Sequence, residues 1–146
     1  MTNRAALNEV IAFSRAADGT LTQVGRYPTF GNGIGVDFDA QGGLLLSDDH
    51  RTLYAANPGS DDVTVFAVNG DHLTPIQKIH AGDEPLSMTR FGNLLYVLDG
   101  SVAGNQITGF TVASDGTLTP LPNSTRMLSS PIAVLATSCS APMAAP

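Results

Sequence analysis

One short connection of the chain brings together side chains that could transfer protons. His80 is followed three and four positions later by Asp83 and Glu84. An imidazole beside two carboxylates can act as a general acid and base, or as a weak metal site. We therefore take these three residues as the candidate ligand-binding site. The alternative interpretation is a polar surface loop, which is the commoner role of such a segment.

The other reactive side chains do not form a recognisable site. His50 and His72 fall in predicted turns, and no two histidines share the spacing of a metal-binding motif. Cys139 lies between two serines with no base placed beside it, as a catalytic nucleophile would require. Arg51 and Arg90 are isolated charges. The sequence therefore predicts no catalytic residue, no metal and no cofactor.

A glycine-rich stretch, Gly31-Asn32-Gly33-Ile34-Gly35, invites comparison with a phosphate-binding loop. The dinucleotide fingerprint needs a third spaced glycine at the start of a helix, and the phosphate loop needs Gly-Lys-Ser/Thr. The chain has neither pattern at this place. We interpret the stretch as a long connection between repeated units.

Composition excludes several classes of partner. The net charge of the 146-residue chain is −6, and lysines and arginines form no cluster. A nucleic acid or an anionic membrane surface needs a basic footprint, so neither is an expected partner. No apolar run approaches the roughly 20 residues of a membrane span. A single cysteine excludes an internal disulfide and a cysteine-based zinc site.

The first eight residues lack the apolar core of a signal peptide. The expected location is therefore the cytoplasm if this N-terminus is the native one, and is otherwise left open.

The elements that position the candidate residues belong to a repeated hairpin. Each copy has alternating β-branched or aromatic residues, which suit a pleated strand, followed by Asp-Gly or Asn-Gly, which suits a tight turn. The copies lie 53 and 44 positions apart, a period typical of arrays of supersecondary units. The marker pairs are Phe13 with Leu21, Phe66 with Leu73, and Phe110 with Leu118.

Further strands complete the repeats. The pattern predicts a half unit at 8–29, four-stranded units at about 43–82 and 85–127, and the first strand of another unit at 131–137. Residues 138–146 are rich in Ala, Ser and Pro and are expected to form a loose tail. The predicted strands are 9–14, 21–26, 43–47, 52–56, 62–68, 73–80, 85–90, 94–99, 106–112 and 118–121.

Several of these stretches resemble one protein family. They are Gln41–Ser47, Leu53–Phe66, Gly92–Leu98, Ile107–Phe110 and Asp115–Leu121. Together they resemble the blade framework of the seven-bladed lactonase propellers, which include 6-phosphogluconolactonase-like and carboxymuconate-cyclase-like proteins. The resemblance covers residues 8–135. It implies an all-β fold of four-stranded antiparallel propeller blades, about two and a half of them, which is a partial propeller.

The resemblance also bears on function. In this family, lactone hydrolysis is attributed to charged and histidine residues around the central channel, mostly from later blades, and none of them matches a position here. We therefore predict a truncated lactonase-like propeller without a complete active site of its own. The alternatives are a lactone hydrolase in an assembled or full-length form, and a propeller module that binds a protein or a ligand.

The blade count also predicts partners. An incomplete ring leaves blade faces that normally pack on neighbouring blades, and such faces favour self-association. A connection between blades can line the mouth of the channel, so His80, Asp83 and Glu84 would contact a small lactone or sugar there.

Overall fold

The computed structural model describes residues 1–36, 41–101 and 104–129, and every regular element in them is a β-strand. No helix able to cross a membrane occurs in this part of the chain. The strands are β1 Glu9–Arg15, β2 Leu21–Pro28, β3 Leu44–Leu46, β4 Thr52–Asn57, β5 Asp62–Asn69, β6 His72–His80, β7 Pro85–Phe91, β8 Leu94–Asp99, β9 Gln106–Val112, β10 Leu118–Pro120 and β11 Arg126–Met127.

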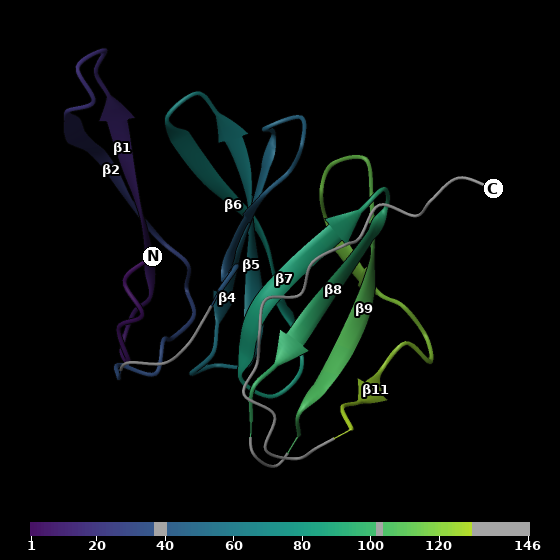
Figure 1. The fold of residues 1–146 in the computed structure, drawn as a ribbon. Helices are drawn as coiled ribbons and strands as arrows, with labels where there is room; N and C mark the ends of the chain where they lie inside the picture. Colours follow the sequence, from purple (N-terminus) through teal and green to yellow (C-terminus); the bar gives the residue numbers. More distant parts are fainter. Residues whose placement is uncertain (37–40, 102–103, 130–146) are drawn as a thin grey trace.

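Strands that follow one another along the chain pair antiparallel and form three sheets. The first sheet is β1-β2, the second is β3-β4-β5-β6, and the third runs from β7 to β10 with β11 also paired to β9. The sheets follow one another in chain order, with the hairpin tips at the upper end of Figure 1. The expected all-β class and four-stranded antiparallel blades are confirmed, and β11 is an addition that the sequence pattern did not predict.

The repeated hairpins turn as their sequences require. The Asp18 carboxylate accepts a hydrogen bond from the Thr20 amide at 2.9 Å, and Asp115 does the same with Thr117 at 2.9 Å. The glycine after each aspartate has a positive φ, 90° in the first turn and 88° in the last, a conformation that strains any residue with a side chain. The local sequence therefore sets the turns before any packing occurs.

Two hydrophobic clusters hold the sheets together. The larger one lies between the second and third sheets, where Tyr54, Val65, Leu95 and Phe110 are at most 1% exposed. The smaller one lies between the first and second sheets and includes Val10 and Phe66. Because both faces of the second sheet are covered, it is the most completely buried blade.

Equivalent positions of the repeat have different environments. Phe66 and Phe110 are 0% and 1% exposed, whereas Phe13 is 53% exposed. Leu21 is 60% exposed, and it lies diagonally across from Phe13 on the same face of the first sheet because Phe13 pairs with Gln23. The outer face of the β1-β2 sheet is thus open, whereas the same face of the other sheets is covered by a preceding sheet.

Some expectations fall outside the described residues. They are the first strand of another unit at 131–137 and the tail at 138–146, which includes Cys139. The glycine-rich connection after β2 is described up to residue 36, and it contains no helix there.

The buried and exposed copies of one repeat position give a matched test of the core. We expect Phe110→Ala to lower the free energy of unfolding by about 3–5 kcal/mol, since it leaves a cavity between two sheets. Phe13→Ala removes the same atoms from a half-exposed position and should cost less than about 1 kcal/mol. Urea unfolding followed by circular dichroism measures both. Equal losses would contradict the assignment of the core.

Candidate functional site

The β4–β5, β6–β7 and β8–β9 connections lie together at one end of the sheets, opposite the turns of the repeated hairpins (the lower end of Figure 1). Four acidic residues at this end, Asp61, Asp83, Glu84 and Asp99, are here called the blade-end cluster. The Asp61 carboxylate accepts a hydrogen bond from the Glu84 amide at 2.9 Å, and the Glu84 carbonyl accepts one from the Gly100 amide at 2.9 Å. These bonds join the β4–β5, β6–β7 and β8–β9 connections.

The residues predicted from sequence lie at this end, each in a different setting. His80 is the last residue of β6 and is exposed, opposite Asp62 of β5. Asp83 is exposed and lies beside Gly104, where an added Cβ would be 3.5 Å from its Oδ2 atom. Glu84 is half-buried and has a left-handed φ of 59°. Within the described chain no hydrogen bond or ion pair joins the three, so their shared role stays a prediction.

The same part of the chain holds no group of three or more His, Cys, Asp or Glu side chains arranged to bind a metal ion. Within the blade-end cluster, a backbone hydrogen bond holds the carboxylate of Asp61.

Asp99 is a member of the cluster that the sequence interpretation missed. It ends β8 and is 0% exposed, and both carboxyl oxygens are without a hydrogen-bond partner of acceptable geometry in the described chain. A Cβ on Gly82 would collide with these oxygens, so only glycine leaves room for the carboxyl group there. The group is therefore enclosed by backbone and by other acidic residues.

The environment of Asp99 favours its neutral form. Its pKa is raised to about 7, mainly because burial removes the carboxylate from water. Gln106 and the Asp83 backbone lie near the carboxyl group as donors, and they lower its pKa in part. The negative charges of Asp83 and Asp61 add to it. A carboxyl group with a pKa of about 7 exchanges its proton near neutral pH, as an acid–base catalyst would, but full burial keeps Asp99 from contact with a substrate.

The interface between the first and second sheets holds an amide, Asn57, at the equivalent position. Asn57 follows Leu53 by four residues as Asp99 follows Leu95, and both leucines pair with the repeated phenylalanine. The Asn57 amide donates hydrogen bonds to Asp62 at 2.7 Å and to Thr64 at 3.0 Å. Its Oδ1 atom accepts one from Asn8 at 3.0 Å. All of its polar groups are thus satisfied, unlike those of Asp99.

The residue that faces this position differs between the two interfaces in the same way, from an amide to a carboxyl group. Asn8 precedes Phe13 by five residues, and Asp61 precedes Phe66 by five. Two amides that bond to each other in the first interface are therefore replaced by two carboxyl groups in the second. Alignment of the repeats residue by residue would have found this from sequence, because it places acidic residues where a buried amide pair belongs.

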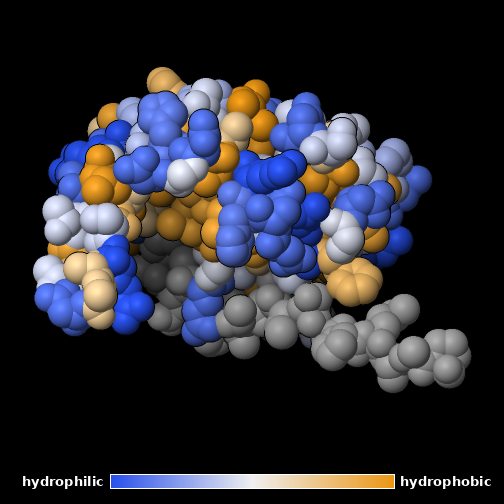
Figure 2. All heavy atoms as spheres, turned by 90° about the horizontal axis from the view of Figure 1, so that it is seen from above, coloured by the Kyte–Doolittle hydropathy of each residue, from blue (hydrophilic) through white to orange (hydrophobic). Residues whose placement is uncertain are grey.

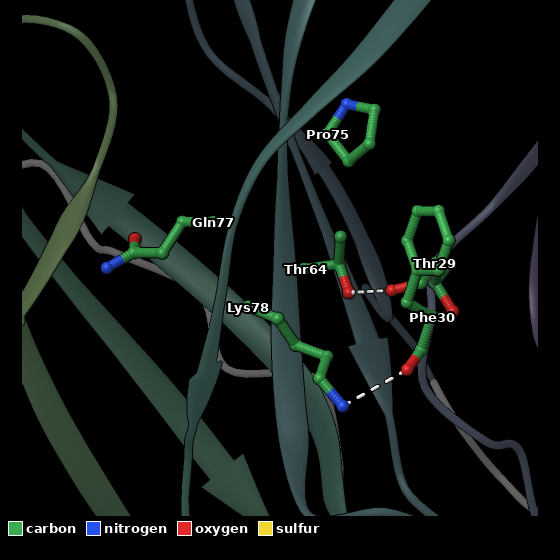
Figure 3. A pocket seen from close by; sticks show the side chains of 6 residues that line it. All are labelled: Thr29, Phe30, Thr64, Pro75, Gln77 and Lys78. Atoms are coloured by element: carbon green, nitrogen blue, oxygen red, sulfur yellow. Dashed lines mark hydrogen bonds between the residues drawn. The ribbon is translucent and has the colours of Figure 1, made fainter.

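A pocket of about 400 Å³ lies at the outer side of β5 and β6, and Figure 3 shows its lining. The Lys78 Nζ atom donates to the Phe30 carbonyl at 3.0 Å and forms an ion pair with Asp62 at 3.3 Å. Thr64 donates to the Thr29 carbonyl. Gln77 points away from the other side chains in Figure 3 and bonds to the Leu118 backbone through both amide atoms. These polar groups serve the fold, so the pocket is no better a ligand site than the blade-end cluster.

The buried carboxyl group predicts a pH dependence that one substitution removes. A folded-state pKa of about 7, above the ordinary value, means that protonated Asp99 stabilises the fold at low pH. This stability is lost as pH rises from about 4 to 7, by on the order of 2–4 kcal/mol. Asp99→Asn cannot ionise and should exceed the wild type in unfolding free energy above pH 7. Urea unfolding from pH 4 to 8 measures the difference between the two proteins.

The reciprocal change is the control for this prediction. Asn57→Asp places a carboxyl group beside Asp62 and should destabilise the fold increasingly as pH rises. A constant difference between Asp99→Asn and the wild type over pH 4–8 would contradict the raised pKa.

Comparisons with known proteins agree with this architecture. Residues 6–136 match the model of the family described as "Lactonase, 7-bladed beta-propeller". Among curated proteins no similar sequence is found. A crystal structure from Lactobacillus plantarum is 28% identical with a TM-score of 0.64, over 77% of this chain and 34% of that one.

Two further structures are similar. A candidate 6-phosphogluconolactonase from Bacteroides fragilis is 27% identical with a TM-score of 0.64, over 82% of this chain and 33% of that one. The periplasmic gluconolactonase PpgL of Pseudomonas aeruginosa, 23% identical with a TM-score of 0.63, covers 77% of this chain and 32% of that one and shows the fold alone. The chain spans about a third of the length of these structures. By its family match, the chain belongs to the seven-bladed β-propeller lactonases.

Proposed function

We propose that this chain is a blade module of a lactonase-type propeller and does not hydrolyse lactones by itself. The observation that carries the proposal is that the blade-end connections bring four carboxyl groups together, while Lys78, Arg4 and Arg26 nearby are held in ion pairs. Hydrolysis of a lactone needs a base that activates water and a positive or hydrogen-bond-donating group that stabilises the oxyanion. The four carboxyl groups of the cluster can act as bases, but none of them supplies a positive charge for the oxyanion.

Three basic side chains near this end are already paired. Arg4 and Arg26 reach the Glu9 carboxylate at 3.5 and 2.6 Å, and hydrogen bonding from Arg26 holds the pKa of Glu9 below its usual range. Lys78 is paired with Asp62. Recruiting one of them for catalysis would break an existing ion pair, which supports a structural role for this set.

The second candidate function is lactone hydrolysis by a longer or self-associated form. It is favoured by the strained geometry of Asp61 and Glu84, which both have a φ of 59° and are hydrogen-bonded to each other. Backbone strain of this kind is concentrated at functional sites. In this case Glu84 or His80 would activate water, Asp83 would help to bind a small lactone or sugar, and the oxyanion-stabilising group would come from another blade or another copy.

An assay distinguishes the two functions. Purified chain is mixed with glucono-δ-lactone or its 6-phosphate at pH 7, and acid release is followed with an indicator dye. We expect the rate to equal spontaneous hydrolysis, because the blade-end cluster supplies bases without a cation of its own to stabilise the oxyanion. Light scattering at the assay concentrations records whether the chain is monomeric or self-associated.

Variants give the control. A rate that grows with chain concentration, and falls at least tenfold in Glu84→Gln or His80→Asn, would show that the chain is a hydrolase. Asp71→Asn changes an exposed residue at the opposite end of the sheet and should leave any such rate unchanged.

A further inference from the structure

One of the three repeated hairpins carries an asparagine at its turn where the other two carry an aspartate. The pairs of residues are Asn69-Gly70 in the second sheet, Asp18-Gly19 in the first and Asp115-Gly116 in the third. An asparagine followed by glycine is especially prone to spontaneous deamidation, because glycine has no side chain to hinder attack by its backbone nitrogen. The β5–β6 turn therefore differs chemically from its two counterparts.

The two aspartates are held in a form that resists the same chemistry. Hydrogen bonds from Thr20 hold the pKa of Asp18 below its usual range, and those from Thr117 do the same for Asp115. An ionised carboxylate is a poor electrophile, so both turns are stable. In the described part of the chain the Asn69 side chain has no such bond, and its neutral amide carbon is open to attack.

The attacking atom of the β5–β6 turn is also available. Residues 69–72 are all exposed, and within the described chain the Gly70 amide donates no hydrogen bond. A Cβ placed on Gly70 would meet no atom within 4 Å, so the turn has room to move. The end rung of the hairpin, where Asn69 pairs with His72, opposes the swing of the Gly70 nitrogen toward the asparagine side chain. Local opening of this kind costs least at exposed ends of elements.

The other Asn-Gly pair of the chain is protected by its surroundings. The Gly33 amide donates to the Arg4 carbonyl at 2.8 Å, and the Asn32 carbonyl accepts a hydrogen bond from Gly59 at 2.9 Å. Gly33 is buried, and a Cβ there would collide with the Asn3 backbone. Attack by the Gly33 nitrogen would break its hydrogen bond and needs space that the packing does not leave. One dipeptide thus occurs in an open and in a protected setting.

The β5–β6 turn is also a point where the first sheet contacts the second. The hydroxyl of Tyr27 in β2 donates to the Asp71 carbonyl at 2.8 Å, and its ring meets the His72 ring edge-on with centroids 5.7 Å apart. Gly70 and Asp71 also border an apolar cavity of about 450 Å³ between these sheets. Figure 2, which looks onto this end of the molecule, shows hydrophobic surface inside a hollow bordered by hydrophilic residues. A change in the backbone of the turn therefore acts on the contact between the sheets.

We infer that Asn69 deamidates spontaneously and that the isoaspartate formed there releases the β5–β6 turn from Tyr27. In the first step the Gly70 nitrogen bonds to the side-chain carbonyl carbon of Asn69, and the bond from this carbon to the amide nitrogen breaks. Ammonia leaves, taking the proton of the Gly70 N–H group, and a succinimide ring remains. Water then opens the ring: addition at the side-chain carbonyl gives aspartate, and addition at the main-chain carbonyl gives isoaspartate.

The two products affect the turn differently. In isoaspartate the main chain runs through the Cβ atom, so an extra carbon atom is inserted between residues 69 and 70. This insertion displaces the rung with His72 and the Asp71 carbonyl, on which both contacts of Tyr27 depend. Aspartate adds the same charge without lengthening the main chain, so it should leave these contacts in place.

Peptide mapping by mass spectrometry tests the site. The full chain is incubated at mildly alkaline pH, which favours loss of the backbone amide proton, and is sampled over time. We expect Asn69 of the folded chain to deamidate roughly tenfold or more faster than Asn32, because an exposed hairpin end opens more readily than a buried connection.

The same chain unfolded in guanidinium chloride is the matched control. Both asparagines should then react at similar rates, since each is followed by glycine. Comparable rates at Asn69 and Asn32 in the folded chain would overturn the proposal, as would an Asn69 that reacts only in the unfolded chain.

Nuclear magnetic resonance of the His72 ring tests the structural consequence. In the isoaspartate form we expect its signals to lose the shift imposed by the Tyr27 ring, while those of His50 stay unchanged. Asn69→Asp is the control for charge and should keep the His72 signals of the wild type. Asn69→Gln, which would have to close a larger ring, should keep them after prolonged incubation. Unchanged His72 signals in the isoaspartate form would show that the turn stays attached to Tyr27 and would overturn the release.

Discussion

The structure depends on the face-to-face packing of the second sheet on the third. Tyr54 and Val65 on one side meet Leu95 and Phe110 on the other, and all four are excluded from solvent. A four-stranded antiparallel sheet with two apolar faces cannot bury both of them alone, so each blade is stable only against its neighbours. The burial of the core and the enclosure of the blade ends follow from this contact.

The repeat also shows how one framework carries different chemistry. The last residue of the second strand of a blade is buried in both complete units, as Asn57 in one and Asp99 in the other. The amide satisfies its hydrogen bonds within the interface, while the carboxyl group is enclosed without matching donors and has a raised pKa. A tolerated polar mismatch in an otherwise regular array is typical of a place where stability has been given up for another purpose.

The acidic end of the blades and the open outer face of the β1-β2 sheet are different kinds of surface. The first gathers carboxyl groups, with Asp61 and Glu84 in the left-handed region. The second exposes the apolar side chains of Phe13 and Leu21. Membership of the lactonase family describes the framework on which both surfaces stand. A catalytic role belongs to a site that holds donors and bases together, and the blade-end cluster holds bases.

Alternation, turn residues and the spacing of the repeat determined the strands, the hairpins and the family, because these depend on local sequence. The ten predicted strands are present with ends shifted by at most two residues, whereas β11 is too short for alternation to reveal. At the acidic end, the sequence pointed to His80, Asp83 and Glu84 because they lie close together in the chain. Asp99 is distant from them in sequence, and an alignment of the repeats is needed to find it. Only the tertiary structure decided that Phe13 is exposed and Phe110 buried, because burial depends on which sheet lies opposite and the two residues share one local pattern.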